Sequence, residues 1–113
     1  MRKVAILSYE GCWGMGVFTA TDFFRIVALL EQHLGLTQTY VVEVLSSDGA
    51  EVCAASGHVI RPDSAITETG DYDLLVIPPV EGARLSAGFS PDTHVLAWLI
   101  AHQANGARVL AMT

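Results

Sequence analysis

The fold class rests on the stretch YDLLVIPP, residues 72–79. From Leu74 to Ile77 every residue is apolar, and Pro78 and Pro79 end the run. A short, uninterrupted apolar run is typical of a strand that is buried on both faces, as in the centre of a parallel sheet. We therefore expect an α/β fold in which this strand lies in the interior of the sheet.

Further strands are expected on both sides of this one in the sequence. Their ranges are 3–8, 40–45 and 107–112, with a hairpin of two short strands at 51–62 that turns at Ser56-Gly57. The apolar and β-branched content of these segments favours strands, and the small residues between them favour turns. The sheet should therefore be built from segments spread over the whole chain.

Two helices are expected between the strands, at 21–34 and 91–103. Thr19 or Thr21 would cap the first helix, which places Asp22 near the positive end of its dipole. Its buried stripe would be Phe23, Val27, Leu30 and Leu34.

The second helix would begin at Ser90-Pro91-Asp92, with a capping serine and proline at the first helical position. Val95, Leu96, Leu99 and Ile100 would form its buried face. Strands that alternate with helices predict a mostly parallel sheet with flanking helices.

Composition limits the class of function. The chain has 113 residues, 51% of them hydrophobic, and a net charge of −6, with no basic cluster. This size fits one small domain, and this charge repels nucleic acid. No apolar run is long enough to cross a membrane or to act as a signal peptide, so we expect a cytoplasmic protein without membrane contact.

The side chains that commonly bind metals show no metal-site spacing. Cys12 and Cys53 form no CxxC pair, and the four histidines share no ligand pattern. We expect no metal and no cofactor. Cys12 lies in a glycine-rich loop, but no histidine is placed to activate it, so catalysis by Cys12 is the less favoured interpretation.

The glycine-rich segment Gly11-x-x-Gly14-x-Gly16 follows the first strand. A dinucleotide loop has the order G-x-G-x-x-G, with an acid about 20 residues later. Here the glycine order is reversed and the acid that closes the second strand, Asp48, lies 32 residues beyond Gly16. The segment is therefore better explained as a loop over the strand ends, where open α/β sheets bind ligands.

The order of these elements resembles the ThiJ/PfpI superfamily, whose members are class I glutamine amidotransferase-like. The matching pieces are Val4–Cys12, Asp22–Arg25, Ser46–Gly49, Ala55–Gly57, Pro62-Asp63, Asp73–Pro78, Ala97–Leu99 and Asn105–Val109. The resemblance implies a flavodoxin-like fold and one domain over residues 1–113. It also implies that this chain is the N-terminal half of a larger domain, truncated before the nucleophile elbow that would follow Met112-Thr113.

The resemblance also implies a site. In the superfamily a helix acid lies beside the nucleophile, and Asp22 holds that place here. A Pro-Gly-Gly sequence would supply backbone N–H groups, but this chain has Pro78-Pro79-Val80 there, and proline has no N–H. We expect no catalytic residues. The expected ligand contacts are Gly11, Cys12, Trp13, Asp22, Pro78, Pro79, Val80 and Glu81.

The first helix is similar to that of the sensor domains of AraC-type transcription regulators. Such a domain is non-catalytic, senses a small metabolite and dimerises, and DNA is bound only through a C-terminal helix-turn-helix region that this chain lacks. The alternative is a superfamily enzyme, such as an isocyanide hydratase-like or peptidase-like protein. Two helices are too few to cover both faces of a sheet with apolar strands at 4–7, 74–77 and 109–112, so we expect a homodimer or further sequence to cover these strands.

Overall fold

The computed structural model describes residues 1–68, 70–83 and 92–112. Its elements alternate along the chain as the sequence predicts. The strands of the main sheet are β1 (Arg2–Leu7), β2 (Tyr40–Ser46), β5 (Ser64–Ala65), β6 (Leu74–Ile77) and β7 (Arg108–Ala111), and the two long helices are α1 (Gly14–His33) and α3 (Thr93–Ala104).

The main sheet has the strand order β5-β2-β1-β6-β7, and all of its pairings are parallel. The expected α/β class with a mostly parallel sheet and flanking helices is therefore confirmed. The interior position of the strand that ends at Pro78 is also confirmed, because β6 pairs with β1 on one side and β7 on the other.

The hairpin expected at 51–62 is present. Its strands, β3 (Val52–Cys53) and β4 (Val59–Ile60), pair in antiparallel fashion as a separate two-stranded sheet. The short strand β5 and the 3-10 helix η1 (Ile66–Glu68) that follows it were not expected. A two-residue strand is too short to leave a periodic pattern in the sequence.

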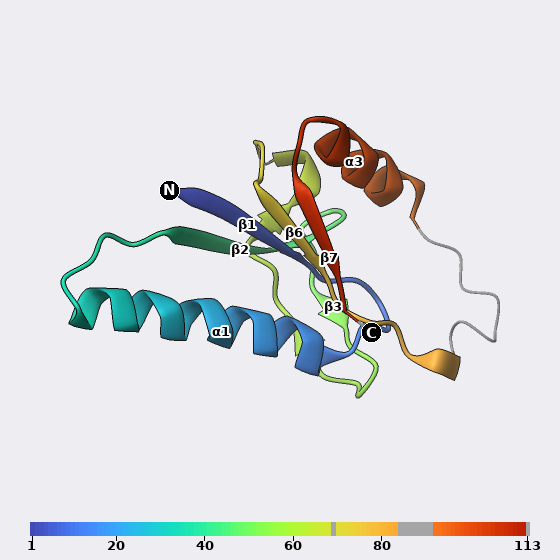
Figure 1. Cartoon of the computed structure of the whole chain (residues 1–113). Coiled ribbons are helices and arrows are strands. Elements are labelled where there is room, and N and C mark those ends of the chain that lie inside the picture. The colour runs from blue at the N-terminus through green and yellow to red at the C-terminus, as the bar shows by residue number, and fades with distance from the viewer. Residues whose placement is uncertain (69, 84–91, 113) are drawn as a thin grey trace.

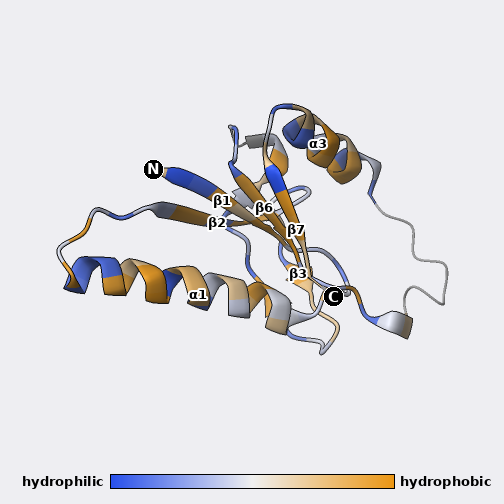
Figure 2. Ribbon diagram, viewed as in Figure 1, coloured by the Kyte–Doolittle hydropathy of each residue, from blue (hydrophilic) through white to orange (hydrophobic). Residues whose placement is uncertain are grey.

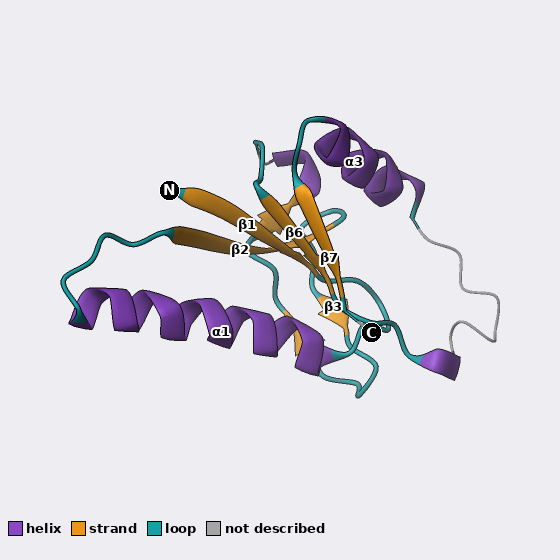
Figure 3. Cartoon of the chain, viewed as in Figure 1, coloured by secondary structure: helices purple, strands orange, loops and turns teal. Residues whose placement is uncertain are grey.

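The helices α1 and α3 lie on opposite faces of the sheet (Figures 1 and 3). Side chains of β1 alternate between them: Val4 and Ile6 belong to the apolar cluster on the α1 face, and Ala5 and Leu7 to the cluster on the α3 face. All four are at most 5% exposed. Leu75 and Val76 of β6 are each 1% exposed, so the expectation of an uncovered apolar surface is wrong for residues 4–7 and for the middle of 74–77.

The edge strand β7 differs from the central strands. All four of its residues are exposed, including Val109 and Leu110. Only for this strand does the structure agree with the expectation of an uncovered apolar surface.

The first helix begins earlier than the sequence predicts. It starts at Gly14, after Trp13, which supplies no side-chain cap. Thr19 and Thr21 therefore lie inside the helix, and Thr21 donates its hydroxyl to the carbonyl of Phe18. Asp22 lies beyond the first turn, so the expected interaction with the positive end of the helix dipole is absent.

The buried face of α1 also differs from the prediction. It consists of Gly16, Val17 and Ala20, extended by Phe24, whose ring packs edge-on against Tyr40 at a centroid distance of 5.1 Å. The expected stripe is largely exposed, at Phe23, Leu30 and Leu34. Apolar residues occur on the exposed side of α1 as well as on its buried side, and Figure 2 shows apolar residues along this helix and the sheet. Because both sides are apolar, periodicity alone did not identify the packed face.

The second long helix, α3, is capped by Asp92, whose carboxylate accepts hydrogen bonds from the backbone N–H groups of His94 and Val95. The expected start at Ser90 and Pro91 lies outside the described residues. Val95, Trp98 and Leu99 pack on the sheet, but Leu96 and Ile100 are exposed, contrary to expectation.

Both long helices end as the sequence predicts, because Gly35 and Gly106 adopt positive φ after their last residues.

Candidate functional site

Three central strands end together at one edge of the sheet. The chain leaves β1 to cross the α1 face towards β2, whereas β6 continues through α3 on the opposite face to β7. The two directions of connection diverge between β1 and β6, and open α/β sheets bind ligands at such a point, outside the carboxyl ends of the strands.

A cavity of about 600 Å³ lies at this edge, next to α3. Pockets for small molecules have volumes of roughly 300–1,000 Å³, so the cavity is large enough for a metabolite. It is lined by Leu7, Ser8, Tyr9, Glu10, Ser47, Asp48, Ala50, Glu51, Val52, Ile77, Asp92, Val95, Leu96 and Leu99.

One wall of the cavity joins β2 to the start of α3. The hydroxyl of Ser47, just after β2, donates a hydrogen bond of 2.9 Å to the carboxylate of Asp92. This bond, together with the N–H groups of His94 and Val95, lowers the pKa of Asp92. The same carboxylate therefore caps α3 and places a negative charge beside the cavity.

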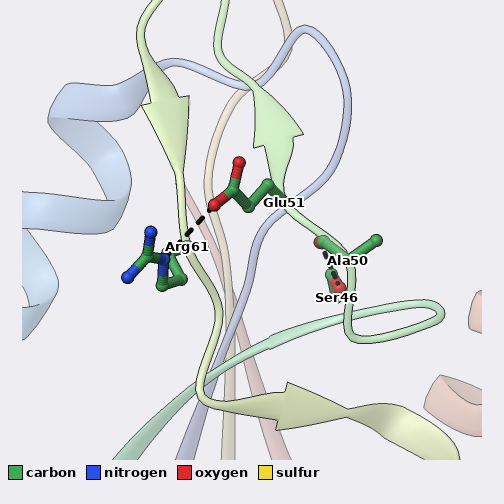
Figure 4. Close-up of polar contacts among 4 residues, drawn as sticks. All are labelled: Ser46, Ala50, Glu51 and Arg61. Atoms are coloured by element: carbon green, nitrogen blue, oxygen red, sulfur yellow. Dashed lines mark hydrogen bonds and ion pairs between the residues drawn. The ribbon is translucent and has the colours of Figure 1, made fainter.

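The turn after β2 also lines the cavity, through Ser47, Asp48 and Ala50. Figure 4 shows the contacts of Ser46 and Glu51 at this turn. Ser46 donates its hydroxyl to the carbonyl of Ala50, and the backbone N–H of Ala50 donates to Asp48. Glu51 follows directly and forms an ion pair of 3.3 Å with Arg61 across the hairpin region. Local hydrogen bonds therefore close the turn. Its acidic residues, Asp48 and Glu51, are exposed at the rim of the cavity.

The loop after β1 completes the lining. Glu10 accepts a hydrogen bond of 3.0 Å from the backbone N–H of Cys53. The hydroxyl of Tyr9 donates to the carbonyl of Pro78, and burial raises the pKa of Tyr9 to about 12. Tyr9 therefore holds the ends of β1 and β6 together as a neutral phenol.

The two loops of the site expected from the sequence do meet. The N–H of Trp13 donates to the carbonyl of Pro79 at 2.9 Å, and the N–H of Glu81 donates to the carbonyl of Gly11 at 3.2 Å. Cys12 and Val80 pair between these bonds as an antiparallel bridge. Seven of the eight expected ligand residues are therefore neighbours, although none of the eight lines the cavity described above.

Direct packing fills the space between α1 and the end of β6. A Cβ placed on Gly16 would lie 2.7 Å from the Cβ of Pro78 and 2.9 Å from the Cδ of Pro79. Gly16, and not Asp22, is therefore the α1 residue that abuts this strand end. Asp22 is exposed six residues later, about 9 Å farther along the helix axis.

Cys12 is fully buried, and this burial raises the pKa of its thiol. A thiol in such surroundings forms the nucleophilic thiolate less readily than a free cysteine does. Trp13, by contrast, is 42% exposed. The position of Cys12 therefore fits a packing role.

Most of the cavity lining was not expected from the sequence. Ser47 and Asp48 follow β2 directly, so the rule that ligands bind at the carboxyl ends of parallel strands would have selected them. The contribution of Asp92, Val95 and Leu99 depends on how α3 packs across the sheet, which no local pattern in the sequence determines.

Within residues 1–68, 70–83 and 92–112, no three His, Cys, Asp or Glu side chains are grouped so that they could hold a metal ion. No helix in that part of the chain has the length and apolar character needed to cross a bilayer.

Comparison with known proteins gives structural neighbours only. No protein-family model and no curated protein matches the chain. Among solved structures, a proposed transcriptional regulator protein from Vibrio parahaemolyticus is 14% identical with a TM-score of 0.78, over 97% of this chain and 55% of that one. An AraC family transcriptional regulator from Pseudomonas putida is 17% identical with a TM-score of 0.71, over 98% and 64%.

DJ-1beta of Drosophila melanogaster is 20% identical with a TM-score of 0.71, over 97% of this chain and 54% of that one. The chain thus spans about half the length of solved structures that it resembles. Proteins described as DJ-1 superfamily and ThiJ/PfpI family members are among the further matches. The chain therefore has the flavodoxin-like α/β fold of these DJ-1, ThiJ/PfpI and transcriptional-regulator structures.

Proposed function

We propose that this chain is the ligand-sensing part of an AraC-type bacterial transcription regulator and that it catalyses no reaction. The observation that carries the proposal is the cavity of about 600 Å³ at the carboxyl ends of β1, β2 and β6. The shared fold with the regulator from Pseudomonas putida supports the regulator class. Residues 1–113 would form the N-terminal half of the sensor domain.

Two features of the same edge favour binding over catalysis. Cys12 is buried with a raised pKa, so no reactive thiolate is supplied there. Pro79 has no N–H, and its carbonyl already accepts a hydrogen bond from Trp13. A developing oxyanion at this strand end would therefore lack the backbone donor that a glycine at this position would supply.

The ligand contacts expected at Gly11–Trp13 and Pro78–Glu81 remain part of the proposal. Both segments adjoin cavity residues in the sequence, Glu10 and Ile77, so a bound molecule that extends beyond the cavity would reach them. Asp22, exposed on α1, would take part only if the ligand reaches the outside of that helix.

The proposed partners follow from the proposed sensor function. The sensor would form a homodimer in the cytoplasm and would contact DNA only through a C-terminal helix-turn-helix region that is not part of this chain. The net charge of −6 supports the view that residues 1–113 do not bind nucleic acid themselves.

A panel of small metabolites screened by thermal shift tests the proposal. A ligand at about 100 times its Kd stabilises a protein by roughly 2.7 kcal/mol, which is easily detected. Ala50 lines the cavity but uses only its backbone in the turn, so Ala50→Trp should fill the space and abolish the shift. Ala101→Trp, on the exposed side of α3, is the matched control and should respond like the wild type.

A panel that stabilises nothing, or an Ala50→Trp variant that responds as the wild type does, would contradict the sensor proposal.

The second candidate is an enzyme of the superfamily, isocyanide hydratase-like or peptidase-like, which the position of Cys12 at the carboxyl edge favours. We expect no hydratase, hydrolase or glyoxalase turnover. Turnover that is lost in Cys12→Ala but kept in Cys53→Ala would establish the enzyme instead.

A further inference from the structure

We infer that the cavity beside α3 takes an organic cation, a molecule with an apolar body and an ammonium or similar positive group. The inference rests on the proposed sensor function and adds the chemical class of the ligand. It follows from two separate properties of the lining, its apolar walls and the sign of its charges.

The walls nearest the sheet are apolar. Leu7 and Ile77 come from the ends of β1 and β6, and Val95 and Leu99 face them from α3. Leu7 is 5% exposed, and the other three are partly buried. A ligand that places hydrocarbon against these side chains would remove apolar surface from water, which favours binding.

The charges at the rim all have one sign. Four carboxylates line the cavity, Glu10, Asp48, Glu51 and Asp92, and none of its lining residues is a lysine, an arginine or a histidine. Walls that carry one sign of charge raise the local concentration of ions of the opposite sign. The lining therefore attracts cations and repels carboxylates and phosphates.

Three of these four charges are not neutralised by an ion pair in the described part of the chain. Glu10 and Asp48 each accept a hydrogen bond from a backbone N–H, and Asp92 accepts from backbone N–H groups and the Ser47 hydroxyl, all neutral donors. Only Glu51 has a cationic partner, Arg61, and that pair is exposed to solvent. The negative charge is thus available to a ligand.

The hydrogen bonds also hold the carboxylates in place. Each of Glu10 and Asp48 uses one named oxygen, Oε1 or Oδ1, for its backbone contact, and Asp92 is fixed as the cap of α3. A positive group that enters the cavity therefore meets preorganised acceptors and need not order flexible side chains, which lowers the entropic cost of binding.

Three probes that share one apolar body test the inference: 4-phenylbutylamine, 4-phenylbutanol and 4-phenylbutyrate, titrated into the protein by calorimetry at pH 7. The amine should bind about tenfold more tightly than the alcohol, since Glu10 and Asp48 should each change affinity by roughly threefold, and the carboxylate should bind least tightly. Raising the salt concentration to about 0.5 M should weaken amine binding and leave alcohol binding unchanged.

The variant Glu10→Gln/Asp48→Asn removes two charges but keeps both hydrogen-bond acceptors, and it should remove most of the preference for the amine. The matched control is Glu31→Gln/Asp71→Asn, which also removes two negative charges, at acids that do not line the cavity, and should keep the preference. Thermal melts of both variants establish that they are folded.

An alcohol or carboxylate that binds as tightly as the amine would overturn the ligand class while leaving a functioning cavity. An equal loss of preference in both double variants would show that the attraction comes from overall charge, which also overturns it. If none of the probes binds and Ala50→Trp has no effect on any metabolite, the cavity is not a ligand site and the sensor proposal fails as well.

Discussion

The carboxyl edge of the sheet is closed on the side of α1 and open on the side of α3. On the α1 side, Gly16 lies against Pro78 and Pro79 without room for a Cβ, and Cys12 is fully buried. On the α3 side, the helix starts at Asp92, across a cavity of about 600 Å³ from the end of β1. The two helices cover the same strands, but they leave very different space at the strand ends.

The difference shows that a single small residue, Gly16, determines how closely a helix packs against the strand ends in this fold. Gly16, in the first turn of α1, lets the helix approach Pro78 and Pro79 closely, so the chain itself fills the space between α1 and the end of β6. The start of α3 is held by hydrogen bonds from Ser47 and its own backbone, with no such close contact. Binding is therefore expected on the side where polar contacts, and not packing, position the helix.

Truncation of a side chain to alanine should have the largest effect on the free energy of unfolding, and this effect should differ between the two faces of β1. Ile6 packs on the α1 side and is 0% exposed, so Ile6→Ala should cost about 3–5 kcal/mol of unfolding free energy. Leu7 already borders the cavity, so its surroundings lose fewer contacts, and Leu7→Ala should cost about 2 kcal/mol. Urea denaturation of both variants measures the difference, and equal costs would mean that the two sides are packed alike.

A methyl group added to α1 tests the closed side directly. Gly16→Ala should destabilise the protein by about 2 kcal/mol, because the new Cβ would overlap two rigid proline rings. Gly14→Ala is the control, since its nearest neighbours would be at ordinary contact distances of 3.6 and 3.7 Å. It should be neutral or stabilising by up to about 1 kcal/mol. Chemical denaturation that ranks Gly14→Ala below Gly16→Ala in stability would contradict the close approach.

The phenol of Tyr9 joins the two sides, because it packs against both apolar clusters and donates to Pro78. Tyr9→Phe should cost about 1 kcal/mol of stability at pH 7. The folded pKa of about 12 exceeds the ordinary value of 10.0, so the neutral form is favoured in the folded state. Stability should be complete below pH 10 and fall as the pH rises towards 12.

The Tyr9→Phe variant should not show this loss of stability between pH 10 and pH 12, and thermal melts between pH 9 and pH 12 measure the difference. A wild-type protein that loses no more stability in this range than the variant does would show that Tyr9 is not buried as a hydrogen-bonded phenol.

The smallest effect is expected at the open side, at Asp92. Its pKa is lowered in the folded state, so the stability that it contributes is present above the ordinary pKa of 3.8 and is lost as the pH falls through the lower, folded value. Asp92→Asn keeps a side chain that caps helices well but carries no charge. The difference in melting temperature between the two proteins should therefore change only below about pH 4.

Thermal melts of both proteins between pH 2 and pH 7 measure this change. In a second variant, Ser47→Ala, the stability that is lost at low pH should be smaller than in the wild type. A pH-independent difference between wild type and Asp92→Asn would show that Ser47 and the helix N-terminus do not stabilise the charged carboxylate.

The sequence by itself determined the order of strands and helices, the interior position of β6 and the ends of both long helices. These features depend on local physics: an apolar run with no alternation predicts a strand covered on both faces, and a glycine that reaches positive φ ends a helix. The meeting of Gly11–Trp13 with Pro78–Glu81 was also predictable, because the carboxyl ends of neighbouring parallel strands lie at one edge.

Only the tertiary structure decided where α1 begins, which of its faces is buried and where the cavity lies. Gly14 and Gly16 favour a loop by intrinsic propensity, yet both lie in the first turn of α1, and at Gly16 the contact with Pro78 and Pro79 requires a residue without a side chain. The exposed Phe23, Leu30 and Leu34 satisfy the helical period as well as the buried residues do. Periodicity identifies a face, but the neighbouring strands determine which face is covered, and that information lies in contacts between distant parts of the chain.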